Sequence, residues 1–230
     1  MAKFYKQNNI SEGDGNVFWV TLSDLMLGLA IVFITLFVLA MTGFSQQEIQ
    51  QQQTQIEIVD KINEEFEKNN VPAIVDKMTG DLKISDADLF DLNSWVLSEK
   101  GKRLLDKVAP TYIDAIFADK ELAKQVANVS IEGHTDSHTF AGVNSKDDQF
   151  LLNMDLSIKR ANSVAQYILK TNYNKENADK FRKILIVEGK SFNEPIIENG
   201  KENYDKSRRV VLKLKVKKWD VATALGLRHD

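Results

Sequence analysis

The chain has 230 residues, a formal net charge of −3 and no cysteine. Once a membrane segment and a connector are set aside, this length leaves room for one domain of ordinary size. The near-neutral charge points neither to nucleic acid nor to a polybasic membrane patch. The absence of cysteine excludes disulfides, cysteine zinc sites and a lipidated cysteine anchor.

An apolar run occupies residues 17–44, after a polar tail of residues 1–16. A helix needs about 20 apolar residues to cross roughly 30 Å of hydrocarbon, so the run predicts one transmembrane helix. Its apolar core is longer than that of a signal peptide, and no A-x-A-like site follows it, so we expect it to remain as an anchor.

The flanking charges predict the orientation of this helix. Lys3 and Lys6 precede the run, and no Lys or Arg follows it until Lys61. Positive residues stay on the cytoplasmic side of a span. We therefore expect a cytoplasmic N-terminus in the bacterial inner membrane and a periplasmic C-terminal domain.

One carboxylate, Asp24, interrupts the apolar run and admits two interpretations. Either the helix begins at Leu25 with Asp24 or Ser23 as its N-cap, or it begins near Val17 and places the carboxylate on the order of 7 to 10 Å inside the membrane. Burying an aspartate costs roughly 2.5 to 3.5 kcal/mol, and each following Leu, Ile, Val or Phe returns roughly 0.3 to 0.6 kcal/mol. We favour the second interpretation, because the apolar residues outweigh one acid and an intramembrane acid is by default functional.

Residues 45–70 are rich in Gln and Glu and contain no Gly or Pro, which predicts a helical connector. Ile49, Ile56, Val59 and Phe66 follow an a/d-like spacing, although polar residues interrupt it, and this spacing suggests pairing in a dimer. A solvated tether is the alternative.

The pattern of an α/β domain extends over residues 71–218, followed by a tail of residues 219–230. Its last strand carries lysines on one face, which is typical of a strand that faces solvent and is a weak sign of nucleic-acid binding. The expected elements are a hairpin at 73–76 and 82–85, a helix from about Ser98 that bends or restarts at Pro110, strands at 129–132, 184–188 and 208–217, and a helix at 156–170.

Three short motifs bring together residue types that bind a zwitterion. They are Gly133-His134-Thr135-Asp136 at a strand end, Asn153-Met154-Asp155-Leu156-Ser157 with Arg160 opening a helix, and Ser207-Arg208-Arg209 opening the last strand. An aspartate binds an ammonium group, whereas arginine and the free N–H groups of a helix start bind a carboxylate.

Other interpretations of these motifs are weaker. His134, Asp136 and His138 are not spaced like a known metal-ligand set on a strand. Ser157 has neither a G-x-S-x-G context nor an evident base, which argues against a nucleophile. A purely structural salt bridge between Asp136 and Arg160 remains open.

The motifs GHTD, NMDLSIKRANSV and SRRVVLKL, in this order, resemble the OmpA-like peptidoglycan-binding domain over about residues 71–216. The resemblance implies a mixed sheet with helices on one face. It also implies that Asp136 and Arg160 grip the diaminopimelate of the stem peptide, and that Asn153, Leu156 and Arg208 line the same pocket. Residues 137–139 depart from the usual glycine-containing turn, and the loop that follows is longer than in the minimal domain.

A single span with one acid, a connector and an OmpA-like domain resemble the B subunit of an ion-driven stator of the MotB type. The segment WVTLSDLMLGLAIVFITLF resembles the MotB-like subunit of the Zorya anti-phage defence system more than flagellar MotB. This resemblance implies a homodimer inside a ring of five MotA-like chains, with Asp24 carrying H⁺ or Na⁺. It also implies that the protein is not an enzyme and binds no cofactor or metal. By the same resemblance, residues 45–70 would act as a plug that keeps the ion pore shut.

Two rival functions remain. A static anchor would tether peptidoglycan to the inner membrane, with Asp24 as a helix cap. A wall sensor would signal through the N-terminal tail, which at 16 residues has little room for a signalling domain. A flagellar stator subunit is the alternative within the same class as the defence protein.

Overall fold

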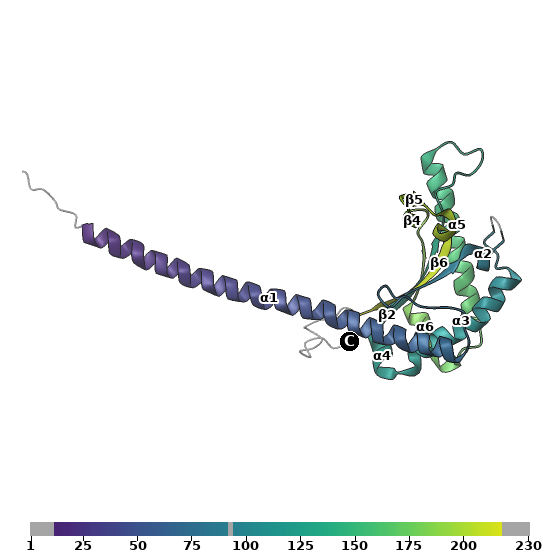
Figure 1. Ribbon diagram of the computed structural model, residues 1–230, viewed down its shortest axis with the longest axis horizontal. Helices are drawn as coiled ribbons and strands as arrows, with labels where there is room; N and C mark the ends of the chain where they lie inside the picture. The colour runs from purple at the N-terminus through teal and green to yellow at the C-terminus, as the bar shows by residue number, and fades with distance from the viewer. Residues whose placement is uncertain (1–11, 92–93, 218–230) are drawn as a thin grey trace, which may run out of the picture. The chain divides into compact units, whose positions relative to one another are not determined.

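The computed structural model describes residues 12–91 and 94–217 (Figure 1). The chain has two compact units, residues 1–49 and residues 50–230. The expected C-terminal tail at 219–230 and residues 1–11 of the expected N-terminal tail lie outside the described residues.

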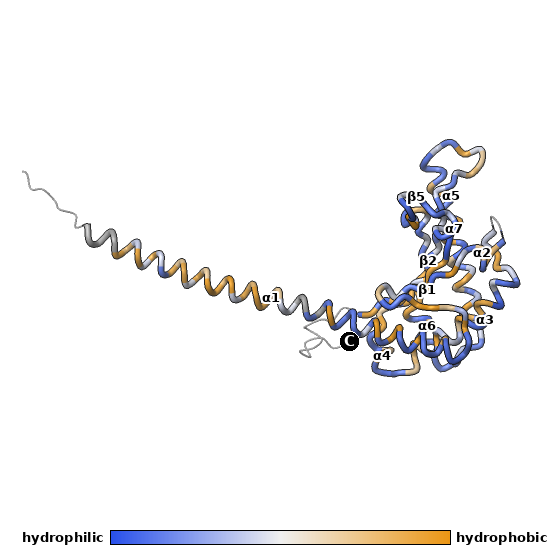
Figure 2. Tube along the Cα trace, viewed as in Figure 1, coloured by the Kyte–Doolittle hydropathy of each residue, from blue (hydrophilic) through white to orange (hydrophobic). Residues whose placement is uncertain are grey.

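The first unit is helical. Helix α1, Glu12–Lys68, begins before the apolar run and continues through it into the second unit. Asp24 therefore lies inside a helix, and the interpretation in which it caps a helix that begins at Leu25 is wrong. The run reaches a mean hydropathy of 2.6, and α1 is the one helix among the described residues that is long and apolar enough to cross a membrane. Figure 2 shows apolar residues all along this run, as expected for a membrane span.

The second unit is built on a four-stranded sheet with the order β1-β6-β2-β3. Its strands are β1, Asp81–Ser85; β2, Val126–His134; β3, Leu185–Gly189; and β6, Arg209–Val216. Strand β6 pairs antiparallel with β1 and β2, whereas β2 and β3 are parallel, so the predicted mixed sheet is confirmed. A separate hairpin joins β4, Ile197–Glu198, to β5, Lys201–Glu202.

The helices cover one face of this sheet, as expected. On β2, Val129 and Ile131 are fully buried in the core on that face, and Gly133 meets the backbone of Ser157 there. The helices of the second unit after α1 are α2, Asp86–Leu89; α3, Glu99–Ala118; α4, Lys120–Gln125; α5, Lys146–Ile168; α6, Ala178–Ile184; and α7, Tyr204–Ser207, with a 3₁₀ turn at Lys175–Asn177. Helix α3 passes through Pro110 without a break, and the predicted first hairpin is reduced to a single bridge between Val75 and Leu82.

The end of α1 belongs to the core of the domain, so the expected start of the domain at residue 71 is wrong. Ile58, Val59, Ile62 and Phe66 are each at most 2% exposed. The ring of Phe66 lies 6.5 Å from that of Tyr112 on α3. Of the four positions with a/d-like spacing, Val59 and Phe66 therefore pack inside their own chain, whereas Ile49 is 52% exposed and Ile56 is half-buried. The compact domain begins near residue 50 instead of 71.

Helix α5 begins earlier than the sequence predicts. Its N-cap is Ser145, whose hydroxyl accepts a hydrogen bond from the backbone N–H of Asp148 at 3.3 Å. Asn153 and Arg160 therefore lie inside the helix, where the backbone N–H groups are already bonded to carbonyls one turn earlier. We expected a helix to begin near Asn153 and to bind a carboxylate with its free N–H groups. This expectation is wrong, because the helix begins at Lys146.

Candidate functional site

A cavity of about 300 Å³ lies where β2 ends, α5 passes and β6 begins. All five residues that the sequence predicts for the outer-domain site line it. The lining residues are Asp86, Thr135, Asp136, His138, Thr139, Phe140, Asn153, Leu156, Arg160 and Arg208. The structure thus brings together three motifs that are far apart in the sequence.

Local geometry explains how α5 comes to line the cavity. Asn153, Leu156 and Arg160 are spaced by three and four residues and so share one face of the helix. This face can approach β2 because residue 133 is glycine: a Cβ atom there would lie 2.1 Å from the carbonyl oxygen of Ser157. The glycine of the GHTD motif is therefore a packing requirement of the site.

Asp136 is 6% exposed and is held by two partners. Arg208 forms an ion pair with its Oδ2 atom, and His138 contacts the same oxygen through Nδ1 at 3.1 Å. Burial of Asp136 opposes its ionisation, but the hydrogen bonds from His138 and Arg208 outweigh burial and lower the pKa of its carboxyl group. Asp136 is thus a carboxylate at neutral pH.

Arg160 is paired with an acid that the sequence analysis did not identify. Its Nη2 atom lies 2.9 Å from Oδ2 of Asp86, and its Nε atom donates to the carbonyl of Ser94 at 3.0 Å. Burial raises the pKa of Asp86, and the nearby positive charge of Arg160 opposes this increase. The alternative in which Asp136 and Arg160 form a structural salt bridge is therefore wrong, because Arg160 pairs with Asp86 instead.

No sequence signal pointed to Asp86. It is the first residue of α2, directly after β1, and belongs to none of the three motifs. Its partner Arg160 comes from a distant part of the chain, and only the folded sheet brings them together.

The cavity contains two carboxylates and two guanidinium groups, so its charges balance. A ligand that carries an ammonium and a carboxylate on one carbon can replace the ion pair between Asp136 and Arg208 with two new ion pairs. Its ammonium group then replaces Arg208 beside Asp136, while its carboxylate binds the released guanidinium. Every buried charge keeps a partner during this exchange, which avoids the penalty of an isolated ion.

The loop between β2 and α5 forms the rim of the cavity. Gln149 holds it by accepting from the N–H of Phe140 at 2.7 Å and donating to the carbonyl of Val143 at 2.7 Å. The His138 ring packs at a tilt of 49° against Tyr204 of α7, with centroids 3.9 Å apart. The residues that depart from the usual turn are therefore anchored to the rest of the domain.

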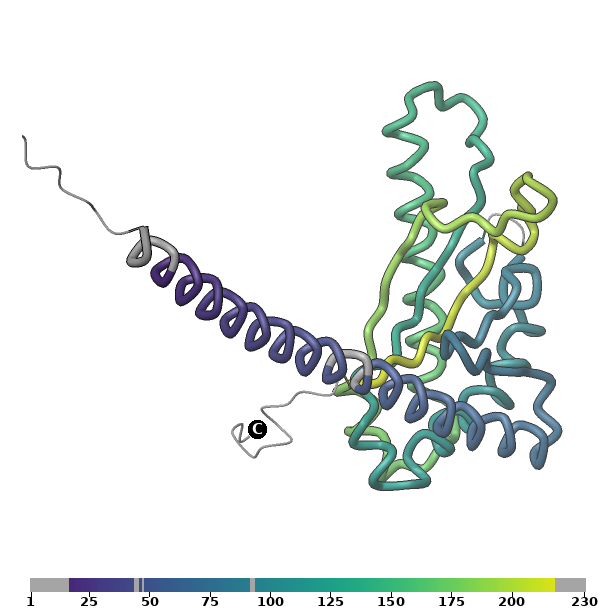
Figure 3. Tube along the Cα trace, turned by 60° about the vertical axis from the view of Figure 1, so that its left-hand side comes forward, coloured from purple at the N-terminus to yellow at the C-terminus, as the bar shows by residue number. Residues whose placement is uncertain are grey.

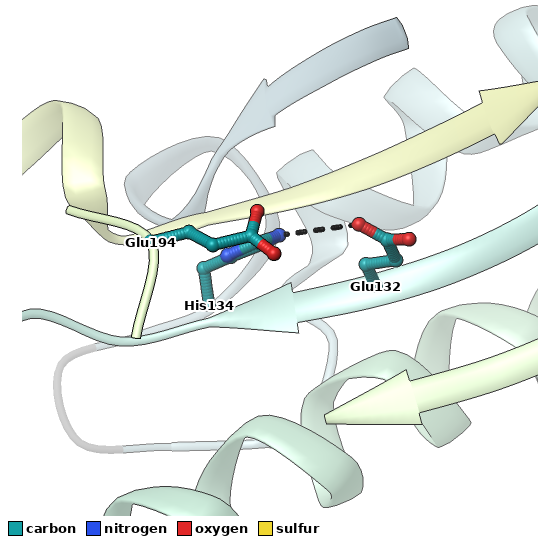
Figure 4. Close-up of side chains that lie close together, drawn as sticks. All are labelled: Glu132, His134 and Glu194. Carbon is teal, nitrogen blue, oxygen red and sulfur yellow. Dashed lines mark ion pairs between the residues drawn. The ribbon is translucent and has the colours of Figure 1, made fainter. Parts of the chain in front are cut away.

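His134, the histidine of the GHTD motif, lies close to two acids. His134 is 1% exposed and lies on the sheet beside Glu132, at 3.7 Å between Nε2 and the carboxylate, while Glu194 approaches from a loop (Figure 4). Lys190 and Lys213 lie 3.7 and 3.9 Å from Glu132 and supply positive charge there. We therefore assign no metal ion to this cluster.

Ser157 has a structural role. Its hydroxyl donates to the carbonyl of Met154 at 2.8 Å and accepts from the N–H of Ser191 at 3.1 Å. The side chain is fully buried under these bonds, so it is not presented to a substrate.

Comparisons with known proteins identify the family of the chain. The family model described as the OmpA family matches residues 89–209, slightly more than half of the chain. The Zorya protein ZorB of Escherichia coli, Crooks strain, is 30% identical over 210 residues, covering 86% of this chain and 88% of that protein. A second Zorya protein ZorB, from Escherichia coli O139:H28, is 27% identical over 210 residues, covering 86% and 79%.

Among solved structures, a MotB-like protein from Desulfovibrio vulgaris shares the fold, with a TM-score of 0.51 and 21% identity. The similarity covers 75% of this chain and 96% of that one. This similarity concerns the fold, whereas the family model and the sequence relatives show that the chain belongs to the OmpA family and to the Zorya ZorB proteins.

Proposed function

We propose that this protein is the peptidoglycan-anchored B subunit of an ion-driven stator complex in the bacterial inner membrane, of the kind that serves Zorya anti-phage defence. The observation that carries this proposal is the charge-balanced cavity formed by the three motifs. Its two acids and two arginines suit a zwitterionic group. The apolar part of α1 supplies the membrane anchor that such a subunit requires.

The ligand that fits the cavity is the diaminopimelate of the peptidoglycan stem peptide. The far end of this residue carries an ammonium and a carboxylate on one carbon. Asp136 binds the ammonium group, and Arg160 and Arg208 bind the carboxylate, with Asn153 and Leu156 shaping the walls. The ion pair between Asp136 and Arg208 supports this assignment, because the ligand ammonium would replace Arg208 beside Asp136 and the ligand carboxylate would bind the freed guanidinium group.

The proposed role of Asp24 is to carry the ion, H⁺ or Na⁺. It is the only charged residue between positions 17 and 43. The hydroxyls of Thr21, Ser23 and Thr35 each donate to a carbonyl one turn earlier, at 2.7 to 3.0 Å, so the other polar groups nearby are satisfied within the helix. A carboxylate can bind and release either of these cations. One charge that crosses the membrane releases about 2.3 kcal/mol per 100 mV, which can drive a conformational step.

The partners follow from the same proposal. Two copies of this chain lie inside a ring of five MotA- or ZorA-like chains, which would shield the Asp24 carboxylates from lipid. Lys3 and Lys6 keep the N-terminus in the cytoplasm, and the cavity-bearing domain is periplasmic. Wall binding holds the dimer still, so that ion flow moves the ring. Residues 58–66 are part of the domain core, which leaves them unavailable as a plug.

A sedimentation assay with purified cell-wall sacculi tests the wall-binding part of the proposal. We expect full-length protein in mild detergent to sediment with the sacculi, and Asp136→Ala and Arg160→Ala each to abolish this. The exposed Asp147→Ala and Arg103→Ala are matched controls and should bind normally.

Competition identifies the ligand group. Free diaminopimelate should release the protein from sacculi, whereas Nα-acetyl-lysine amide, which presents an ammonium group with no carboxylate on the same carbon, should not. Unchanged binding by the Asp136 and Arg160 variants, or equal competition by the blocked lysine, would remove our assignment of the site.

A further inference from the structure

A groove of about 580 Å³ with an apolar floor lies at the end of the domain opposite the cavity. Five lysines surround its floor, and we call it the basic groove. Its lining residues are Phe117, Lys120, Ala123, Lys124, Val126, Ala127, Lys180, Lys183, Ile184 and Lys217. None of the three motifs contributes to it.

Strand β2 separates the two sites. Val126 begins this strand and lines the basic groove, and His134 ends it two residues before Asp136. A nine-residue strand spans about 26 Å at 3.3 Å per residue. Figures 1 and 3 agree with this separation: α4 lies at the lower end of the domain, and the loop before α5 lies at the upper end.

The positive charge of the basic groove is largely uncompensated. All five lysines are exposed. Lys124 pairs with Glu121 at 2.7 Å, whereas Lys120, Lys183 and Lys217 make no ion pair within residues 12–91 and 94–217. The nearby acids are occupied: Asp119 pairs with Lys61, and Asp179 with Arg182. A strongly positive surface thus exists in a chain whose net charge is −3.

The chain enters the domain at this same end, where residues 50 and 51 follow the unit that contains the apolar run. Within the domain, the side chain of Gln51 donates to the carbonyl of Val216 at 3.5 Å, directly before Lys217. Lys217 also lines the adjoining hollow formed by Gln50 and Gln51. The apolar run ends at residue 44, so Gln51 can lie no more than about 25 Å from the bilayer, even with the chain fully extended.

We infer that the basic groove binds the headgroups of anionic phospholipids on the periplasmic surface of the inner membrane. The lysines contact phosphate groups, and the apolar floor receives the upper part of an acyl chain. Each lysine close to an anionic surface strengthens binding about fivefold, and the effect fades within a Debye length of about 8 to 10 Å. Docking by this end directs the cavity away from the bilayer, towards the cell wall.

The absence of cysteine makes a direct test possible, because one introduced cysteine is a unique labelling site. Full-length protein with Gln125→Cys, an exposed position beside the groove, is labelled with a fluorophore and placed in nanodiscs that contain a nitroxide-headgroup lipid. An Asn144→Cys label at the cavity end reports on the opposite side of the domain. We expect stronger quenching at position 125 when phosphatidylglycerol is added to phosphatidylcholine, and no such increase at position 144.

Charge variants connect this signal to the groove. Lys120→Gln, Lys183→Gln and Lys217→Gln together should remove the increase caused by phosphatidylglycerol, as should high salt. A control triple variant removes the same charge from other exposed positions and should retain the increase; its changes are Lys83→Gln, Lys107→Gln and Lys146→Gln. Sedimentation with sacculi should be unchanged in both triple variants, because the cavity is intact.

Three results would overturn the inference. They are equal quenching with and without phosphatidylglycerol, an equal loss in both triple variants, or a groove triple variant that keeps the full increase caused by phosphatidylglycerol. None of these results depends on whether the cavity binds peptidoglycan.

Discussion

The pair formed by Asp86 and Arg160 gives the sharpest prediction about the candidate site. The side chain of Arg160 is 4% exposed and that of Asp86 is 12% exposed. Asp86→Ala removes the carboxylate and leaves a buried guanidinium without its partner at 2.9 Å. Breaking a buried ion pair in this way costs about 3 to 5 kcal/mol, and we expect the lower limit because the cavity admits water.

A loss of about 3 kcal/mol should lower the melting temperature of a domain of this size by roughly 6 to 12 °C. The double variant Asp86→Ala with Arg160→Met removes both charges and should recover much of this loss, since no unpaired ion remains. The full-length chain in detergent can be followed by tryptophan fluorescence during heating. Trp95 suits this measurement, because Lys159 lies 4.7 Å from its ring on the same helix that carries Arg160.

Two results would refute this reasoning. Asp86→Ala could lower the melting temperature by less than about 2 °C, which would mean that the pair contributes little. Alternatively, the double variant could be less stable than the single variant, which would mean that packing of the Arg160 side chain, rather than its charge, determines the loss.

Three further predictions concern packing and pH. Phe66→Ala should destabilise the domain by about 3 to 5 kcal/mol in chemical denaturation, because its ring is 1% exposed in the core; a loss below about 1 kcal/mol would contradict the placement of the end of α1. Gly133→Ala should weaken sedimentation with sacculi, because its Cβ would lie 2.1 Å from the Ser157 carbonyl oxygen and push α5 away; normal binding would contradict this packing argument. Asp136 has a folded-state pKa below its ordinary value, so its stabilising contribution is complete above the unfolded pKa of about 3.9 and is lost as pH falls through the folded pKa. The difference in melting temperature between the wild type and Asp136→Asn should therefore be constant from neutral pH to about pH 5 and shrink below pH 4; a difference that shrinks already near pH 6 would contradict the low pKa.

The sequence predicted the cavity well because its motifs are local. Gly133 to Asp136 end a strand, and Asn153, Leu156 and Arg160 have helical spacing, so short stretches reveal which residues lie together. Asp86 was missed because an isolated acid after a strand has no pattern of its own. Its pairing with Arg160 depends on the arrangement of the whole sheet.

The end of α1 shows a second limit of sequence patterns. Val59 and Phe66 have a spacing that suits a dimer seam as well as the core of their own domain. Only the position of α3, with Tyr112 against Phe66, decides between these possibilities. The start of α5 was missed for a related reason: residues 146–152 carry no motif, and their polar beginning resembles a loop.

The net charge of the chain does not reveal the basic groove. Its lysines come from α4, α6, and the end of β6, and acids elsewhere in the chain cancel them in the net charge. An overall charge of −3 argued against a polybasic membrane patch, but it holds no information on where charges gather.

The central claim, that Asp24 carries the ion of a wall-anchored stator, is tested most directly by its isosteric replacement. Cells that express this protein with the proposed MotA-like subunit would carry the wild type, Asp24→Asn or Asp24→Glu, with membrane insertion checked for each. Proton and sodium flux and protection against phage are then measured together. We predict that Asp24→Asn abolishes both, and that Asp24→Glu, which keeps a carboxylate, retains part of each. Full ion flux and protection in the inserted Asp24→Asn protein would contradict the account.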